Sequence, residues 1–280
     1  MTIQVRETQP ALLQNWGKLS KRMLAMSGKA WFVAAIVGQL LFTLFILLFY
    51  GSRIVSGDFA AWNEKRLITG YVAGDTMGNL MFASHVLMAA IVTLGGLVQL
   101  IPSLRKRAMW FHKWNGRVFM TLSLLAAIGG IWLVWGRGSF LSITSGSSVS
   151  FNGVLIVIFA VIAWRAAVLK RIESHRRWAM RTFMVVNGVW FFRVGLMATM
   201  FFNQDRVGMT RKLDGPVDTA IQLSSYLIPL ALLELYFFAQ SSRSPSVKIL
   251  TSAVVILATA VTILGTFGSY RFLWSPYMFG

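Results

Sequence analysis

The chain has 280 residues, of which 56% are hydrophobic and 13% are charged, and its formal net charge is +18. Soluble domains carry about 25% charged residues, so this composition, with its apolar residues in long unbroken runs, excludes an ordinary soluble domain and predicts an integral membrane protein. The lack of cysteine excludes disulfides, thiolate catalysis and cysteine-based metal sites. The basic residues lie between the apolar runs, as in membrane proteins generally, so we expect no nucleic-acid partner.

A basic segment, residues 1–30, precedes the first apolar run. Its sequence ALLQNWGKLSKRML places Leu12, Trp16, Leu19 and Met23 on one helical face, with the basic residues elsewhere. This pattern is typical of an amphipathic helix in a membrane interface, and a disordered basic tail is the alternative. The apolar run that follows is too long for a signal peptide, so we expect it to remain as an anchor. We therefore predict a cytoplasmic segment, 1–30, and one transmembrane helical domain, 31–280.

The apolar runs predict an all-α fold, a polytopic transmembrane helical bundle, because a bilayer-spanning helix needs about 20 mostly apolar residues. Seven spans are predicted, over residues 31–50, 79–101, 118–136, 151–169, 183–202, 220–240 and 249–268. Most of the 27 lysines and arginines fall in the N-terminal segment and in alternate loops on its side of the membrane. The positive-inside rule then predicts that the N-terminus is inside and the C-terminus is outside.

Two polar loops on the predicted inner side resemble each other. WFHKWNGR, residues 110–117, joins the second and third spans, and SHRRWAMR, residues 174–181, joins the fourth and fifth. Each loop holds a histidine followed by a tryptophan and then an arginine. Two hairpins of the same polarity with the same motif suggest a parallel internal repeat of spans 2–3 and 4–5.

These motifs, preceded by SHVLMAAIVTLGGLVQLIPSLR, resemble a family of predicted bacterial membrane proteins that is catalogued only as a domain of unknown function. The resemblance covers roughly residues 80–200 and rests on the HxxxGR-like and HRRWxxR motifs. The signature positions that it implies are His85, His112, Gly116, Arg117, His175, Trp178, Arg181 and Arg193. It also implies a seven-span architecture and a bacterial plasma membrane, but it implies no activity.

The first of three functional hypotheses is a membrane redox protein with one b-type haem, which exchanges electrons with quinol. Membrane haems commonly take two histidines from facing helices, and His112 and His175 are expected at similar depth at the inner ends of their helices. Arg117 and Arg181, about one turn deeper, would then meet the haem propionates.

The second hypothesis is a transporter or lipid-binding protein, in which Arg117, Arg181 and Arg193 bind an anionic ligand or head group. The third is an accessory subunit of a larger membrane complex. In that case the histidines and arginines are interfacial residues that contact water or lipid phosphate, as such residues often do. The sequence contains no soluble catalytic motif, so it leaves open whether the protein is an enzyme.

Polar residues within the predicted spans point to a second site. A charge at the position of Arg193 costs about 2.5–3.5 kcal/mol on insertion scales, so we expect a partner or a cavity there. Glu234 is the only acid within a predicted span, which predicts an Arg193–Glu234 ion pair or a shared polar pocket. Asn187 is expected to add a hydrogen bond to this pair. His85 is expected to lie deep in the second span, where a helix–helix hydrogen bond is the alternative to a functional role.

Overall fold

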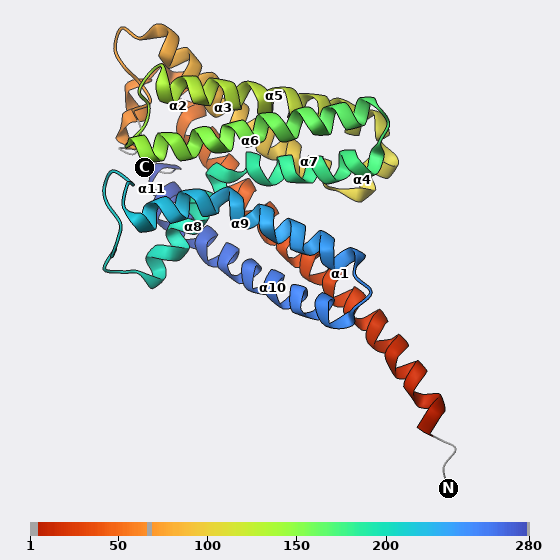
Figure 1. Ribbon diagram of the computed structural model, residues 1–280. Helices are drawn as coiled ribbons and strands as arrows, with labels where there is room; N and C mark the ends of the chain where they lie inside the picture. The colour runs from red at the N-terminus through yellow and green to blue at the C-terminus, as the bar shows by residue number, and fades with distance from the viewer. Residues whose placement is uncertain (1–4, 66–68, 279–280) are drawn as a thin grey trace.

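The computed structural model describes residues 5–65 and 69–278, with side chains described from residue 15 onward (Figure 1). All regular structure in these ranges is helical, which confirms the predicted all-α membrane fold. Six helical segments are long and apolar enough to cross a membrane, and a bent pair of helices makes a seventh if it is taken as one span. The helices are α1 (Val5–Phe45), η1 (Ile46–Gly51), α2 (Ser52–Ser56), η2 (Ala60–Glu64), α3 (Thr76–Gln99), α4 (Pro102–Arg107), α5 (Met109–Trp135), α6 (Ile143–Val168), α7 (Ile172–Val186), α8 (Gly188–Phe202), α9 (Pro216–Ser241), α10 (Pro245–Gly268), η3 (Ser269–Trp274) and α11 (Ser275–Met278).

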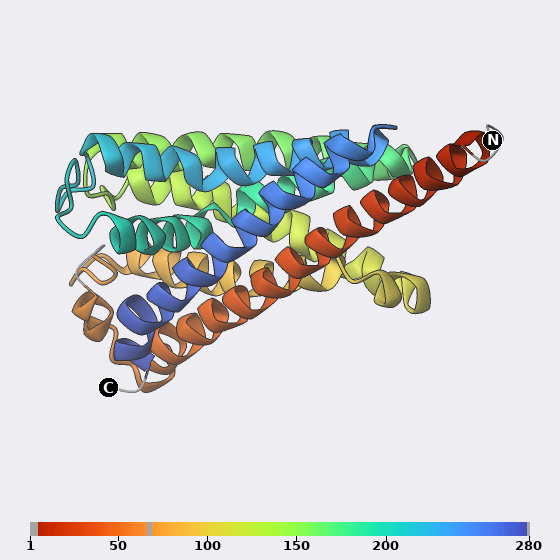
Figure 2. The same cartoon turned by 90° about the horizontal axis from the view of Figure 1, so that it is seen from below.

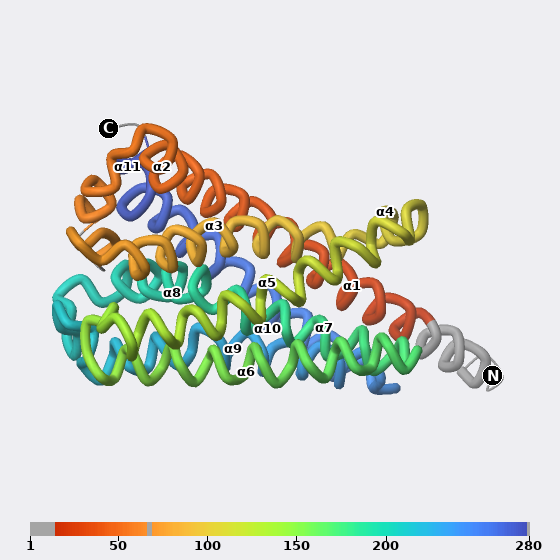
Figure 3. The backbone as a smooth tube through the Cα atoms, turned by 90° about the horizontal axis from the view of Figure 1, so that it is seen from above, coloured from red at the N-terminus to blue at the C-terminus, as the bar shows by residue number. Residues whose placement is uncertain are grey.

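Helix α1 runs without a break from the basic N-terminal segment into the first predicted span. Trp16, Leu19 and Met23 are exposed on one face, as the amphipathic pattern predicts, while the side chain of Leu12 lies outside the described residues. In Figure 2, the N-terminal part of α1 projects beyond the rest of the bundle. The remainder of α1 packs along α10 (Figure 3). The location of the N-terminal part in a membrane interface stays a prediction.

Most helices begin several residues before the apolar run from which the sequence predicted them. Helices α5 and α7 start at Met109 and Ile172, so the predicted starts at residues 118 and 183 are too late. The two histidine motifs lie in the first turns of these helices, at whose inner ends the sequence placed both histidines. Hydropathy detects only the apolar part of a helix, whereas the backbone continues through polar turns until a cap or a proline ends it. Asp75, Ser142 and Ser244 are such caps, because each side chain accepts a hydrogen bond from a backbone N–H of the following turn.

The fifth predicted span is a broken helix and not a continuous one. Helices α7 and α8 meet at Asn187 with a bend of 53°. The Asn187 side chain donates to the Phe183 carbonyl (2.8 Å), and Asn152 of α6 donates to the Val185 carbonyl (3.0 Å). Backbone carbonyls that a break frees inside a membrane need such partners, which is why the bend is sustainable here.

The helices form two groups that face each other. Helices α3, α5, α6 and α7 lie along one side of the molecule, and α1, α9 and α10 lie along the other, with α8 joining them at one end (Figure 1). The largest apolar core lies where α1 meets α8, α9 and η3 and includes Phe42, Phe45, Trp190, Phe237 and Trp274. The parallel repeat of spans 2–3 and 4–5 stays a prediction.

Candidate functional site

A cavity of about 1980 Å³ lies between the two groups of helices. Its walls come from α1 and from α3 to α10, and most of the lining side chains are apolar. Both halves of the broken helix contribute, with Phe183 and Met184 from α7 and Phe191 and Val194 from α8. The cavity is larger than the 300–1,000 Å³ of typical small-molecule pockets, so it has room for a long apolar ligand.

The charged lining residues gather at the end of the cavity where α5 and α7 begin. The cations there are Lys29, Arg105, Lys113, Arg117 and Arg176. Glu173 is the acid in this lining, and its carboxylate lies 3.6 Å from Arg176. This end of the cavity, which we call the cationic end, is therefore strongly positive, and the remaining walls are apolar. Such an arrangement suits a molecule with an anionic head and an apolar body.

His112 and His175 both line the cationic end, as the sequence predicted for a shared site. The side chains of Arg105 and His175 lie close enough to His112 to interact with it electrostatically. The Nδ1 of His175 lies 2.9 Å from the Ala163 carbonyl, which can only accept, so Nδ1 carries the proton and donates it. The bare Nε2 of His175 is then left to accept a proton or bind a metal.

Side-chain bonds to the backbone of α3 and α5 hold His112 in place. Gln99 donates to the His112 carbonyl (2.8 Å), and Asn115 donates to the Gly95 carbonyl (2.9 Å). A Cβ on Gly116 would lie 3.0 Å from the Gln99 amide nitrogen. A glycine at this signature position therefore gives Gln99 the room to reach α5.

The predicted partner of Glu234 is wrong, because Glu234 pairs with Arg181 and not with Arg193. The pair is bidentate, with Nε–Oε1 at 2.6 Å and Nη2–Oε2 at 2.9 Å, and it ties α7 to α9. The Arg181 guanidinium also stacks on Trp178, 4.4 Å from the ring centroid. Arg117 stacks on Trp114 and lines the cavity, whereas Arg181 does not line it.

Arg193 lies apart from both arginines, so the three do not form one cluster. Its Nη1 donates to the Val189 carbonyl (2.8 Å), and its guanidinium lies 5.1 Å from the Phe42 ring centroid. Asn187 bonds to its own helix and not to Arg193, which corrects the predicted contact.

His85 lies on α3, away from the cavity lining, and packs against α5. Its ring would lie 3.1 Å from a Cβ on Gly130, and its Nδ1 is buried without a hydrogen-bond partner among the described residues. The helix–helix hydrogen bond of His85 stays a prediction.

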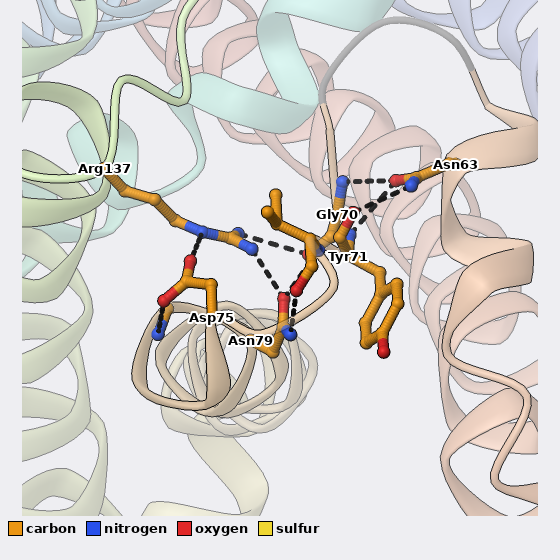
Figure 4. Close-up of polar contacts among 8 residues, drawn as sticks. Asn63, Gly70, Tyr71, Asp75, Asn79 and Arg137 are labelled. Carbon is orange, nitrogen blue, oxygen red and sulfur yellow. Dashed lines mark hydrogen bonds and ion pairs between the residues drawn. The ribbon is translucent and has the colours of Figure 1, made fainter.

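A polar network that sequence reasoning missed lies at the opposite end of the bundle from the cationic end (Figure 4). Arg137 donates to Asp75 (2.8 Å), to the Gly70 carbonyl (3.1 Å) and to Asn79 (2.6 Å). Asn63 accepts from the Gly70 amide, so the segment before α3 is held from two sides. The bonds from Arg137 and from the Gly78 amide hold the pKa of the Asp75 carboxyl below its usual value. The capping signal of Asp75 before TMGNL was visible in the sequence, but its distant partner was not.

Comparison with known proteins identifies the family to which the chain belongs. A family described as "Predicted membrane protein (DUF2306)" matches residues 82–237, which include both histidine motifs and all but the first and last spans. No curated protein and no solved structure matches the chain. With more than half of its length matched, the chain belongs to this family of predicted membrane proteins of unknown function.

Proposed function

We propose that this protein binds an anionic lipid, or a lipid-like molecule with an acidic head, in the cavity between its two groups of helices. The head would lie at the cationic end beside His112 and His175, and the apolar chains would follow the cavity wall. The observation that carries this proposal is the combination of one large apolar cavity with five cations at a single end. We further propose a bacterial plasma membrane location with the cationic end on the cytoplasmic side, where anionic lipids attract basic residues.

The broken helix supports a transport role for the same site. Transporter sites are commonly formed by discontinuous helices near the middle of the membrane, and both α7 and α8 line this cavity. An accessory subunit without a site of its own would instead be expected to pack its polar residues closely. The open space beside His112 and His175 argues against that alternative.

A b-type haem is the second candidate ligand, and it is favoured by the hydrogen bond that leaves the Nε2 of His175 bare. His112 would supply the opposite ligand from the same cavity end, and Arg105, Lys113 and Arg117 would meet the propionates. Arg181, which we expected in that role, is bound by Glu234. A haem there would supply one-electron redox chemistry, with quinol as the expected electron partner.

The experiment measures the affinity of the purified protein for phosphatidylglycerol and for phosphatidylcholine with the same acyl chains. The test variant replaces Lys113, Arg117 and Arg176 with glutamine. The control variant makes the same charge change at three exposed cations of the distant loop before α9, namely Arg206, Arg211 and Lys212.

Each cation near a lipid surface contributes about 1 kcal/mol, so the test variant should bind phosphatidylglycerol up to about 100-fold more weakly. The control variant should bind it like the wild type. Equal affinity for the two lipids, or equal losses in the two variants, would refute lipid binding at the cationic end. A Soret band that is lost in both His112→Ala and His175→Ala would instead support haem.

A further inference from the structure

Two cations without an acidic partner lie in the apolar core at the end of the bundle opposite to the cationic end. Lys65 follows η2 and is only 6% exposed. Arg193, on α8, is partly buried, and its guanidinium lies 5.1 Å from the Phe42 ring centroid. The two cations are close enough to repel each other. In an apolar setting an uncompensated charge is costly, so this pair needs an explanation.

Neither cation has its hydrogen-bonding capacity filled. The Nζ of Lys65 donates to the Leu273 carbonyl (3.1 Å) and lies 4.0 Å from the Phe45 ring centroid. Arg193 donates to a single carbonyl, that of Val189, and otherwise faces the Phe42 ring. An ammonium has three N–H donors and a guanidinium has five, and each cation uses one of them in a hydrogen bond within the described protein.

The Trp274 side chain packs against both aromatic rings that the two cations face. The Trp274 ring packs against Phe42, under Arg193, at 5.5 Å between ring centroids, and against Phe45, under Lys65, at 6.4 Å. Trp274 is completely buried, and its indole N–H has no hydrogen-bond partner. Native structures rarely leave a buried donor unpaired, so the free indole N–H beside two cations that have no carboxylate partner in the described part of the chain indicates a missing acceptor.

The neighbouring acid does not supply that acceptor. Glu64 directly precedes Lys65, but its carboxylate pairs with Arg53 at 2.7 Å. Among the side chains that the structure describes, no carboxylate forms an ion pair with Lys65 or with Arg193. Within residues 5–65 and 69–278, the phenols of Tyr50 and Tyr277 also lie near these cations, Tyr50 near Arg193 and Tyr277 near Lys65.

We propose that Lys65, Arg193 and the indole N–H of Trp274 form a binding site for a small anion at this end of the bundle. The anion is a halide-sized ion or the acidic group of a larger molecule. Apart from the two cations and the indole N–H, the side chains around it are aromatic and offer few polar contacts to a larger polar ligand. This site is separate from the lipid cavity, since none of its three residues lines that cavity. Burial, and to a lesser extent repulsion from Arg193, lower the pKa of Lys65 to about 6. A bound anion would favour the charged form of Lys65 and be held more tightly as the pH falls toward 6.

The experiment follows the melting temperature of the detergent-purified protein while chloride replaces gluconate, a bulky anion, at constant ionic strength. The wild type should show a saturable rise in Tm that is larger at pH 6 than at pH 8. Lys65→Met and Arg193→Gln should lose the rise, and Arg271→Gln, an exposed cation near the same end of the bundle, should keep it. Crystals soaked in bromide should show an anomalous peak beside Trp274, which tests the site even if a variant fails to fold.

A second series of Tm measurements uses phosphatidylglycerol in place of chloride. It shows whether the bound acidic group is a free ion or part of a lipid. If only the lipid raises Tm, and both variants abolish that rise, the acidic group belongs to a lipid and the site stands. No rise with either probe, or rises that both variants keep, together with no bromide peak, would overturn the proposal. The chloride arm and the bromide peak do not depend on the cationic end, so this site and the lipid cavity can fail separately. A rise in Tm with the lipid alone that both variants keep belongs to the cationic end.

Discussion

The pairing of Arg181 with Glu234 makes a prediction that the sequence-based partner, Arg193, does not share. The two bonds are charge-assisted and link α7 to α9, while the side chains are 17% and 41% exposed. Hydrogen bonds to charged groups contribute about 1.5–3 kcal/mol in proteins, but interhelical bonds within membranes average only about 0.6 kcal/mol. For a bidentate pair that is partly exposed, we expect a coupling energy of about 2 kcal/mol.

A double-mutant cycle with Arg181→Gln and Glu234→Gln measures this coupling through the free energy of unfolding in mixed detergent micelles. The matched cycle uses Arg193→Gln with Glu234→Gln and should give less than about 0.5 kcal/mol, as for residues that share no contact. A coupling that is negligible in the first cycle and large in the second would refute the described pairing and restore the sequence-based one.

Two further predictions test the packing of α8 and the network around Arg137. A Cβ on Gly265 would lie 2.2 Å from the Val194 backbone oxygen, so Gly265→Ala should lower the free energy of unfolding by about 1–3 kcal/mol. Gly51→Ala, where no atom lies within 4 Å, should cost nothing in the same denaturation assay. The depressed pKa of Asp75 means that its contribution to stability is present above its normal pKa and is lost as the pH falls below it. Tm should thus fall more steeply between pH 5 and pH 3 in the wild type than in Arg137→Gln, and parallel curves would contradict this role of Arg137.

The sequence was sufficient to predict the helical membrane fold, because apolar length and bilayer thickness decide it almost alone. Two physical effects limited how accurately the helix ends and the helix break could be predicted. Helix ends depend on caps and on polar turns that hydropathy does not register, as the early start of α5 at Met109 shows. The break at Asn187 depends on a donor from another helix, Asn152, which the local turn signal of Asn187 and Gly188 does not by itself predict.

The sequence predicted the position of the two histidines in the candidate site but not the partners of its charged residues. His112 and His175 do share a cavity end, because two equivalent motifs at the starts of two helices lie at the same depth. Partner choice could not be predicted, since it depends on how helices are rotated and packed. The sequence therefore predicted the wrong arginine as the partner of Glu234. It also did not predict the burial of Lys65, which lies in a short segment between helices.

The most direct test of lipid binding is an electron cryo-microscopy map of the protein in nanodiscs that contain phosphatidylglycerol. The proposed function predicts elongated density inside the cavity between the two groups of helices, with its phosphate at the end bordered by His112 and His175. Lipid density confined to the outer surface, with side chains closing the space between α5, α7 and α9, would contradict it.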